Sequence, residues 1–319
     1  MAAISMRESY GHALVEYGAV NPELVVLDAD TSASTMTCFF AEKYPERFFN
    51  IGIAEPCMVD VAVGLALGGK IPFANAFAAL LSLRAIEQVR TCVCYARTNV
   101  KLVAGYAGVS DFKDGPTHHS ITDLAILRSL PGMTVVVPAD ALEAALWVPR
   151  VAEYDGPVYL RLSRAATLPV HGRPPDLVIG KGLLLHPGRD VAIIACGSMV
   201  GRALQAAQEL DRGGIQARVI EMHTLKPLDS DLVLQAAEET GAIVTAEEHS
   251  ILGGLGSAVA EVLGSYRPTP LERVGIHDTF AMTGPDPDTL MDALGLGVQD
   301  IVQSAEKVLA RKGSRKESR

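Results

Sequence analysis

FFNIGIAEPCMVDVAVGLALGG, residues 48–69, joins a short strand pattern at 48–51 to an apolar helix pattern at 55–67. Pro56 near the start of the second pattern supports this division, because proline is favoured in the first turn of a helix. A strand followed directly by a helix is the repeating unit of parallel sheets covered by helices. The stretch therefore predicts an α/β fold.

The same alternation continues on both sides of this stretch. In the first half of the chain it predicts further strands at 24–27, 100–104, 134–137 and 158–162, and helices at 83–96, 122–130 and 141–152. In the second half it predicts strands at 191–195, 217–220, 242–246 and 273–276, and helices at 200–210, 230–239, 256–263 and 301–309. Each half is therefore expected to form a mostly parallel sheet flanked by helices.

A change of composition separates the two halves. The segment LPVHGRPPDLVIGKGLLLHPG, residues 168–188, is rich in proline and glycine, and it predicts a linker with a short hairpin. The 319 residues are enough for two α/β domains of ordinary size. We expect a first domain at 1–167, a linker at 168–189, a second domain at 190–311 and a disordered basic tail at 312–319.

Composition excludes several kinds of partner. The formal net charge of −9 argues against binding to nucleic acid. No apolar run reaches the roughly 20 residues of a membrane helix, and the N-terminal residues lack the pattern of a signal peptide. The five cysteines are odd in number and irregularly spaced, which is typical of a reduced, cytoplasmic protein.

Glu55 is the first candidate for chemistry. It directly precedes Pro56, so we expect it at the cap of the helix, where a carboxylate is also favoured by the helix dipole. Ile53, Cys57 and Met58 surround it with apolar groups. A carboxylate that loses water in this way holds a proton more readily, which suits proton exchange with a heterocycle nitrogen. The structural and the chemical interpretation both stay open.

The segment KDGPTHHSITDL, residues 113–124, is the second candidate. Its DGP sequence predicts a turn, and Ser120 followed by Asp123 resembles a capping box at the start of a helix. His118 and His119 are then expected on a loop at the positive end of that helix. Anions bind at such a position and imidazole stays neutral there. The alternative is an exposed histidine pair with no task.

The third candidate is VYLRLSRAATLPV, residues 158–170. Alternation along the predicted strand places Arg161 and Ser163 on the face opposite the apolar side chains. Arg164 follows at the carboxyl end of the strand, where open α/β sheets bind ligands. An arginine there is suited to phosphate, although a surface ion pair is the ordinary alternative.

Several motifs together carry a resemblance to a known family. They are ELVVLDADTSAST, PERFFNIGIAE, GLALGGKIPF, DGPTHH, AIIACGSMVGRALQAAQEL and AEEHSILGGLGSAVAEVL, in this order. Over about residues 7–310 the sequence resembles the C-terminal half of transketolases, above all of those encoded as two chains. The resemblance implies a thiamine-diphosphate pyrimidine-binding domain followed by a transketolase C-terminal domain. The activity it implies is transfer of a two-carbon ketol unit between sugars or phosphosugars.

The resemblance assigns cofactor residues. Glu55 matches the glutamate that hydrogen-bonds the aminopyrimidine ring and favours its imino tautomer, and Phe77 matches an aromatic packed at the pyrimidine. Leu80 and Leu81 stand where a second, stacking phenylalanine is usual. Activation of the cofactor is therefore expected to be retained, with an aliphatic wall in place of one aromatic.

The resemblance also assigns substrate residues. His118 matches the histidine beside the substrate's carbonyl and hydroxyls, and Asp114 the aspartate at the donor's hydroxyls. Ser34 and Arg164 match groups that hold the sugar phosphate, whereas Tyr106 stands where a phosphate-binding histidine is usual. An anionic sugar is thus the expected substrate, with an altered site for its charged end.

The chain lacks the Gly-Asp-Gly segment that ligates the metal in this family. No metal ligand is therefore assigned to it, and an N-terminal transketolase subunit is expected to supply the diphosphate site and a divalent metal, Mg or Ca. The implied assembly is a two-plus-two heterotetramer with a homodimeric core.

Three rival interpretations stay open at this point. One is the β subunit of a 2-oxo-acid dehydrogenase, and another is 1-deoxyxylulose-5-phosphate synthase, which is normally one long chain. DGPTHH and Arg164 favour sugar chemistry over an oxo acid. The third is a non-catalytic regulatory subunit, which Leu80, Leu81 and Tyr106 favour and the retained Glu55 disfavours.

Overall fold

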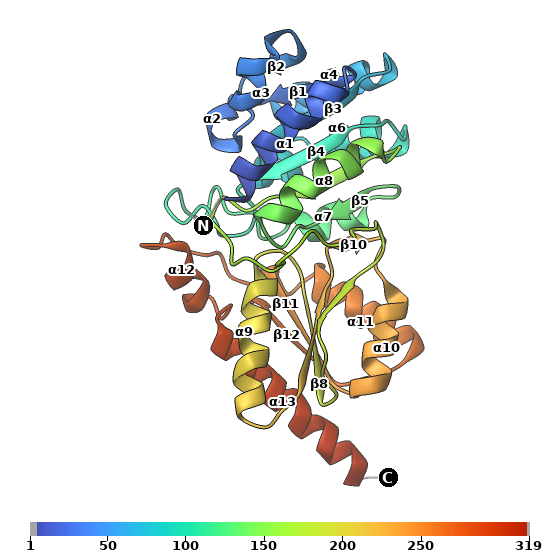
Figure 1. Cartoon of the computed structure of the whole chain (residues 1–319), viewed down its shortest axis with the longest axis vertical. Coiled ribbons are helices and arrows are strands. Elements are labelled where there is room, and N and C mark those ends of the chain that lie inside the picture. Colours follow the sequence, from blue (N-terminus) through green and yellow to red (C-terminus); the bar gives the residue numbers. More distant parts are fainter. Residues whose placement is uncertain (1–4, 318–319) are drawn as a thin grey trace.

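Two β-sheets lie one after the other along the long axis of the molecule (Figure 1). The computed structural model describes residues 5–317, and the side chains of residues 5–313. The predicted fold of two domains, each with a mostly parallel sheet flanked by helices, is confirmed. No helix in the described part of the chain is both long and apolar enough to cross a membrane.

The first sheet has seven strands in the order β10-β5-β6-β4-β3-β1-β2. They are β1 (Leu24–Asp28), β2 (Phe48–Asn50), β3 (Ile71–Phe77), β4 (Lys101–Gly105), β5 (Thr134–Val136), β6 (Val158–Arg161) and β10 (Thr224–Lys226). All neighbours are parallel except β10, which comes from the second half of the chain and pairs antiparallel with β5.

Helices cover both faces of this sheet. One face packs against α1 (Met6–Val20), α3 (Cys38–Lys43) and α8 (Ala141–Glu153). The other packs against α4 (Glu55–Leu67), α5 (Ala78–Leu83), the π-helical η2 (Val89–Tyr95) and α7 (Asp123–Ser129). Three short elements complete this half: α2 (Ser32–Thr35), the 3-10 turn η1 (Pro45–Arg47) and α6 (Ile86–Gln88).

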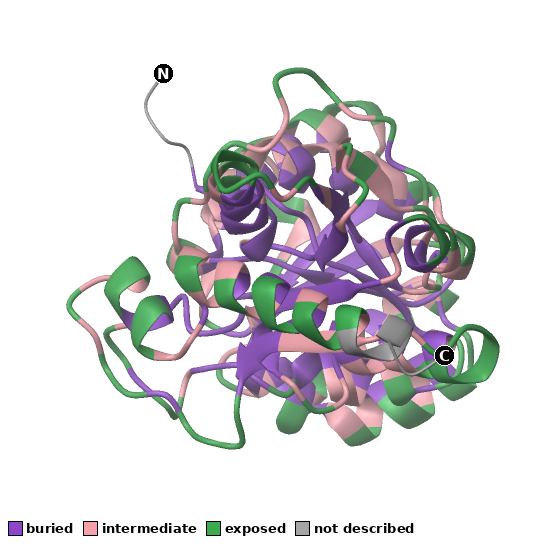
Figure 2. Cartoon of the chain, turned by 90° about the horizontal axis from the view of Figure 1, so that it is seen from below, coloured by how far each residue is buried: buried purple, intermediate pink, exposed green. Residues whose placement is uncertain are grey.

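The second sheet has five strands in the order β12-β11-β8-β9-β7. They are β7 (Leu183–His186), β8 (Val191–Ala195), β9 (Ala217–Glu221), β11 (Ile243–Ser250) and β12 (Leu271–Ile276). One face packs against α9 (Met199–Arg212), α12 (Pro287–Ala293) and α13 (Val298–Glu317), the other against α10 (Ser230–Thr240) and α11 (Leu255–Tyr266). Buried residues concentrate on the strands, and exposed ones on the outward faces of the helices (Figure 2).

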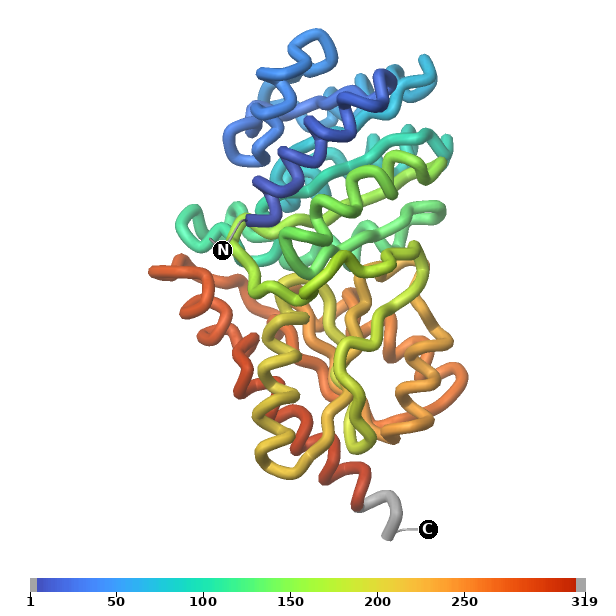
Figure 3. The backbone as a smooth tube through the Cα atoms, in the orientation of Figure 1, coloured from blue at the N-terminus to red at the C-terminus, as the bar shows by residue number. Residues whose placement is uncertain are grey.

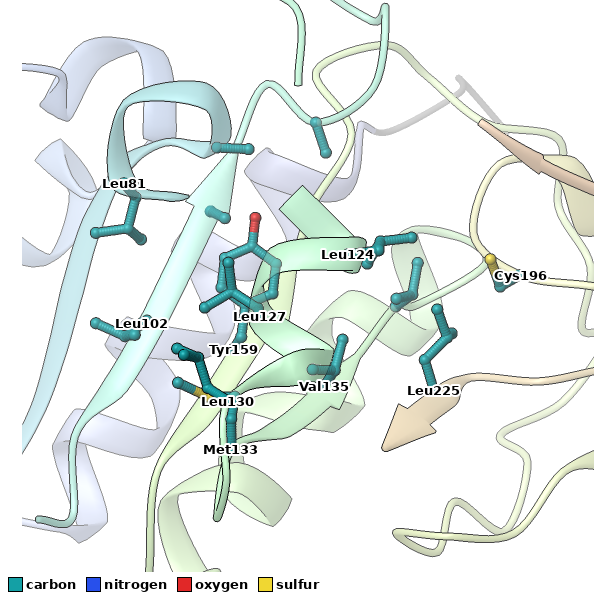
Figure 4. Packing of buried hydrophobic residues seen from close by; sticks show 14 of the residues in the cluster. Leu81, Leu102, Leu124, Leu127, Leu130, Met133, Val135, Tyr159, Cys196 and Leu225 are labelled. Atoms are coloured by element: carbon teal, nitrogen blue, oxygen red, sulfur yellow. The ribbon is translucent and has the colours of Figure 1, made fainter. Parts of the chain in front are cut away.

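A single hydrophobic cluster connects the two halves. Leu124 and Val135 of the first half belong to the same buried cluster as Cys196 and Leu225 of the second (Figure 4). The segment between α8 and β7 runs along the same boundary (Figure 3). Removal of this apolar surface from water therefore fixes the orientation of the two sheets.

Two predicted features of the second half are wrong. Residues 168–188 contain no hairpin, because their one strand, β7, pairs antiparallel with β9 instead. The tail predicted at 312–319 is not separate from the fold, since α13 continues to Glu317 and Lys312 donates to the carbonyls of Asp190 and Thr240. Residues 318–319 lie outside the described part.

The helix α1 and the strand β3 are among the first-half elements that were not predicted. The helix α1 begins with a capping box in which Ser5 and Glu8 satisfy each other's backbone N–H groups. The strand β3 carries Pro72 and Asn75, which weaken a strand pattern. Asn75 is nevertheless tolerated in the core, because it accepts a hydrogen bond from the Tyr10 hydroxyl and donates to two backbone carbonyls.

Candidate active site

Most of the predicted site residues follow one edge of the first sheet. Phe77 ends β3, while Ser34, Glu55, Tyr106 and Arg164 follow β1, β2, β4 and β6. These strands are parallel, so their carboxyl ends meet at the same edge, where α/β sheets bind ligands. At about 4.8 Å between strands, the five strands span about 19 Å.

Glu55 is buried at the start of α4. It is the first helical residue and Ala54 is the cap, so the predicted cap position of Glu55 is wrong by one residue. The predicted burial is confirmed, with only 1% of the residue exposed. The surroundings are less apolar than expected, however, because Arg84 Nη1 donates to both carboxylate oxygens at 3.0 and 2.8 Å. Arg84, which follows α5, was not foreseen as a site residue.

An aromatic pair lies at the carboxyl ends of β3 and β4. The rings of Phe77 and Tyr106 stack with centroids 4.3 Å apart, and His118 meets Phe77 edge-on at 6.0 Å. Tyr106 has a positive φ of 59°, an uncommon conformation for a residue other than glycine. Such backbone strain concentrates at functional sites.

The two predicted leucines differ in their surroundings. Leu80 is partly exposed beside Phe77, whereas Leu81 is only 1% exposed and packs into the core (Figure 4). Successive residues of α5 point in different directions, so the two leucines cannot contact the cofactor in the same way. The contact of Leu81 with the cofactor stays a prediction, as does that of Leu80.

Arg7 of α1 was not predicted, yet it connects two predicted residues. Its Nη1 donates to the carbonyl of Ser34 at 2.9 Å and to the hydroxyl of Tyr106 at 3.3 Å. In the described part of the chain no carboxylate forms an ion pair with Arg7. It therefore places a positive charge, bonded only to neutral groups, beside the aromatic pair.

Arg164 reaches the same aromatic pair from the other side. Its guanidinium carbon lies 5.0 Å from the centre of the Tyr106 ring, and Nη1 contacts Asp111 Oδ1 at 2.5 Å. The Asp111 side chain is fully buried. Burial and a hydrogen bond with Asp114 raise the pKa of Asp111, and the charge of Arg164 opposes them. Arg164 is thus both at the site and half of an ion pair.

The predicted turn at DGPTHH is present. Gly115 has a φ of 81°, and a Cβ at this position would lie 2.9 Å from Thr283, so the turn requires glycine. His118 is partly exposed, with Nδ1 3.0 Å from the Thr117 hydroxyl. His119 is instead buried, with Nε2 3.0 Å from the Asp111 carbonyl, and burial lowers its pKa. Only His118 faces the site.

The predicted capping box after this turn is wrong. Thr122 is the cap of α7, and Asp123 is buried against Arg161, with Nε to Oδ2 at 2.7 Å. The hydroxyl of Tyr159 also donates to Asp123, at 2.7 Å. Burial alone would raise the pKa of Asp123, but Arg161 outweighs it and lowers the pKa. Asp123 therefore connects α7 to Arg161 and Tyr159 of β6 and does not cap the helix.

These residues fit half of a thiamine-diphosphate site. Each Glu55 oxygen accepts one hydrogen bond from Arg84 and keeps a lone pair for a second donor. Phe77 is partly exposed and offers an apolar face to a ring. Within residues 5–313 the one cluster of potential metal ligands is Glu143, His171 and Glu221, which does not include Glu55.

Comparisons with known families agree with this geometry. The description "Transketolase, pyrimidine binding domain" matches residues 2–169, and "Transketolase, C-terminal domain" matches residues 180–301. The chain belongs to the transketolase family. This is a family of transferases that depend on thiamine diphosphate, so both assignments apply to this chain.

Similar proteins define the type of transketolase. The 6-deoxy-6-sulfo-D-fructose transketolase subunit of Clostridium sp. is 43% identical, over 97% of this chain and 96% of that protein. An apulose-4-phosphate transketolase subunit of Phocaeicola vulgatus is 39% identical, over 88% and 90%. A solved structure described as "Split gene transketolase, inactive beta4 tetramer" is 48% identical, covers 97% of this chain and 99% of its own, and has a TM-score of 0.90.

The chain therefore resembles whole subunits of split transketolases, not only halves of longer proteins. It is a transketolase subunit of the C-terminal, split-gene type. The 2-oxo-acid dehydrogenase, synthase and regulatory alternatives are not favoured by these relatives.

Proposed function

We propose that this transketolase subunit transfers two-carbon ketol units between anionic sugars, and that it does so only with a partner chain that binds the diphosphate through Mg or Ca. The observation that carries the proposal is the array of Glu55, Phe77, Tyr106, His118 and Arg164 at one sheet edge. The carboxylate and aromatic rings of this array suit a pyrimidine ring, and its histidine and arginine suit a charged sugar.

Exposed apolar residues near Glu55 support the proposal that a partner chain binds there. Ile53, two residues before Glu55, is 74% exposed. Leu83, which directly precedes Arg84, is 57% exposed. Tyr95 at the end of η2 is 87% exposed. Large apolar side chains that are this exposed are suited to an interface with another chain. We propose that these residues lie at the contacts of a two-plus-two heterotetramer with a homodimeric core.

A relative also supports dependence on a partner. The structure that is 48% identical to this chain is described as an inactive β4 tetramer of a split-gene transketolase. Four copies of a similar chain without another subunit are thus described as inactive. By analogy, this chain alone is expected to bind thiamine diphosphate weakly and to have no turnover.

Each residue of the array has a proposed task. Thiamine diphosphate, when bound, supplies the nucleophilic carbon that accepts the ketol unit. Glu55 holds and exchanges a proton at the aminopyrimidine, and Phe77 and Leu80 pack against that ring. His118 lies beside the substrate's carbonyl and hydroxyls, and Asp114 contacts the hydroxyls of the donor.

Arg7 gives the main support for an anionic substrate. It brings a positive charge to Ser34 and Tyr106 without an ion-pair partner among the described residues, whereas Arg164 is already paired with Asp111. Arginine binds phosphate and similar anions through charge-assisted hydrogen bonds. Two relatives are named for a sulfonated sugar and a sugar phosphate, which is consistent with an anionic end group.

The test is reconstitution. The chain and a partner that carries Gly-Asp-Gly are purified separately, and ketol transfer is measured for each alone and for the mixture, with Mg²⁺ and thiamine diphosphate. Turnover only in the mixture, and faster with a phosphorylated or sulfonated aldose than with a neutral one, is the expected result. Turnover by the isolated chain, or tight metal-dependent binding of the cofactor to it, would contradict the proposal.

A further inference from the structure

Three distant segments bring ionisable side chains together at the junction of the two halves. Glu143 is in the first turn of α8, His171 is in the segment before β7, and Glu221 is the last residue of β9. The Nε2 atom of His171 lies 3.0 Å from an oxygen of each glutamate. Both carboxylates are fully buried, and the imidazole is 7% exposed.

His171 is the only basic side chain paired with the two carboxylates of this cluster among the described residues. No lysine or arginine in this part of the chain pairs with either of them. Buried charges are costly unless they are paired.

Unsatisfied polar atoms surround the same point. Glu221 Oε1 is buried and has no hydrogen-bond partner in the described part of the chain. Neither ring nitrogen of the fully buried His223 has one. His223 packs on Trp147, one turn beyond Glu143 in α8, with ring centroids 5.2 Å apart. Buried polar groups in proteins are nearly always satisfied, so orphaned atoms of this kind point to a ligand.

We propose that Glu143, His171 and Glu221 bind a divalent transition-metal ion, for which zinc is the best match, and that this ion joins the two domains through the linker. A divalent cation would pair with both buried carboxylates. Imidazole nitrogen and carboxylate oxygen are ordinary zinc ligands. Tetrahedral bonds of about 2.0–2.1 Å place ligand atoms about 3.3 Å apart. The ligand atoms here already lie within 4.8 Å of one another, so only small shifts are needed.

The geometry also provides support for these ligands. The Ala139 N–H donates to Glu143 Oε2 at 2.9 Å, which turns Oε1 towards His171. Asp140 Oδ2 accepts from the backbone N–H of His171 at 3.3 Å and so fixes the linker. Outer partners of this kind orient metal ligands. Water can supply the fourth ligand, as it does in many zinc sites with three protein ligands.

This site is separate from the proposed active site. Glu143 follows β5, which lies five strand positions from β2, the strand before Glu55. At about 4.8 Å per strand this is about 24 Å. The ion would therefore stabilise the junction and take no part in binding the diphosphate. Its presence does not depend on the proposed function.

The test measures zinc binding by the untagged chain after treatment with a chelator. Calorimetric titration and elemental analysis are expected to give one equivalent per chain. Co²⁺ in place of zinc is expected to give the intense visible bands of tetrahedral nitrogen and oxygen ligation. His171→Gln and Glu221→Gln should each weaken zinc binding by at least about 100-fold, more than the loss of an outer partner. A circular-dichroism spectrum establishes that each variant is folded.

His186→Gln is the matched control. His186 is on β7, near the cluster in sequence, and its Nδ1 hydrogen-bonds the Ala217 carbonyl instead. This variant should keep full affinity, and zinc should raise the melting temperature of it and of the unmodified chain. The proposal is overturned if the unmodified chain binds no stoichiometric zinc. It is equally overturned if His171→Gln and Glu221→Gln both bind as tightly as the unmodified chain, which would place the ion at surface thiols.

Discussion

Arg84 donates from a single guanidinium nitrogen to both carboxylate oxygens of Glu55, at 3.0 and 2.8 Å. The side chain of Glu55 is 1% exposed and that of Arg84 is 47% exposed. The cation therefore lies at the rim of the site and the carboxylate beneath it. Because the arginine approaches from one side, the carboxylate keeps acceptor positions for a heterocycle N–H.

Replacement of the carboxylate tests its proposed task. Glu55→Gln keeps the size of the side chain but removes its ability to hold and release a proton. We expect cofactor activation in the assembled enzyme to slow by about 100-fold or more, the usual contribution of a positioned acid or base. Exchange of the thiazolium proton for deuterium, followed by quenched NMR, measures this step directly. An unchanged exchange rate would remove Glu55 from the mechanism.

Arg84→Lys is the control for this experiment. It retains a positive charge at the rim while the carboxylate stays intact, so its exchange rate should be much closer to that of the unmodified enzyme than to that of Glu55→Gln. If the two variants slow exchange equally, the ion pair as a whole is required, and proton exchange is not specific to Glu55.

Leu80 allows a test of the aliphatic wall. It is partly exposed and follows the aromatic Phe77 by three residues, so Leu80→Phe tests whether a second ring can pack against the pyrimidine. We expect this variant of the assembled enzyme to bind thiamine diphosphate as tightly as before or more tightly, since an aromatic pair adds about 0.5–1.5 kcal/mol. Calorimetry gives the affinity. A clear loss of affinity would mean that the pocket is shaped for a different packing.

Local patterns were sufficient to predict most of the parallel strands, with β3 as an exception. Strands such as β1 and β8 are buried on both faces, and a buried parallel strand is a continuous apolar run that stands out in a sequence. The strand β10 escaped notice for the opposite reason. It has three residues and is stabilised by pairing with β5, 88 or more positions earlier in the chain. No local signal contains that pairing.

The same limit applies to the site. Glu55, His118 and Arg164 stand beside turns or strand ends, so their own neighbours mark them. Arg7 acts through contacts with residues 27 and 99 positions away, and Arg84 pairs with a residue 29 positions away. The cluster at His171 combines residues 28 and 50 positions from it. Spacing along the chain carries no information about contacts that only the folded sheets create.

The buried pair of Arg161 and Asp123 is expected to be important for stability. Arg161 also donates to the carbonyl of Glu248 in the second domain, at 3.1 Å. Arg161→Met leaves Asp123 charged, fully buried and without its partner, which costs about 3–5 kcal/mol. Urea unfolding measures this loss. Arg90→Met is the matched control, because its pair with Glu87 is more than 60% exposed and is screened by water, so its loss should change stability very little. Equal losses in the two variants would contradict the argument.

A test of Arg164 must also take account of its ion pair with Asp111. Arg164→Ala would leave the buried Asp111 without its counter-charge, so a loss of activity could reflect misfolding. The double variant Arg164→Met with Asp111→Asn removes both charges together. For a phosphorylated sugar we expect kcat/KM to fall by about 10- to 100-fold, the value of one charge-assisted contact. A neutral aldehyde should lose much less. Equal losses for both acceptors would assign the pair to structure alone.

Arg7 is the residue on which the anionic substrate depends most. Its charge has neutral partners, the carbonyl of Ser34 and the hydroxyl of Tyr106, so Arg7→Met leaves no buried carboxylate unpaired and should preserve the fold. In the assembled enzyme kcat/KM for a phosphorylated or sulfonated sugar should fall by about 10- to 100-fold, because a charge-assisted hydrogen bond contributes about 1.5–3 kcal/mol. The same variant should change the reaction of a neutral aldehyde by less than about threefold, within the range of a lost neutral contact. Steady-state kinetics with acceptors matched in length separates the two cases. If Arg7→Met slows charged and neutral acceptors alike, Arg7 only supports Tyr106, and the charge of the substrate must be recognised elsewhere, most simply by the partner chain.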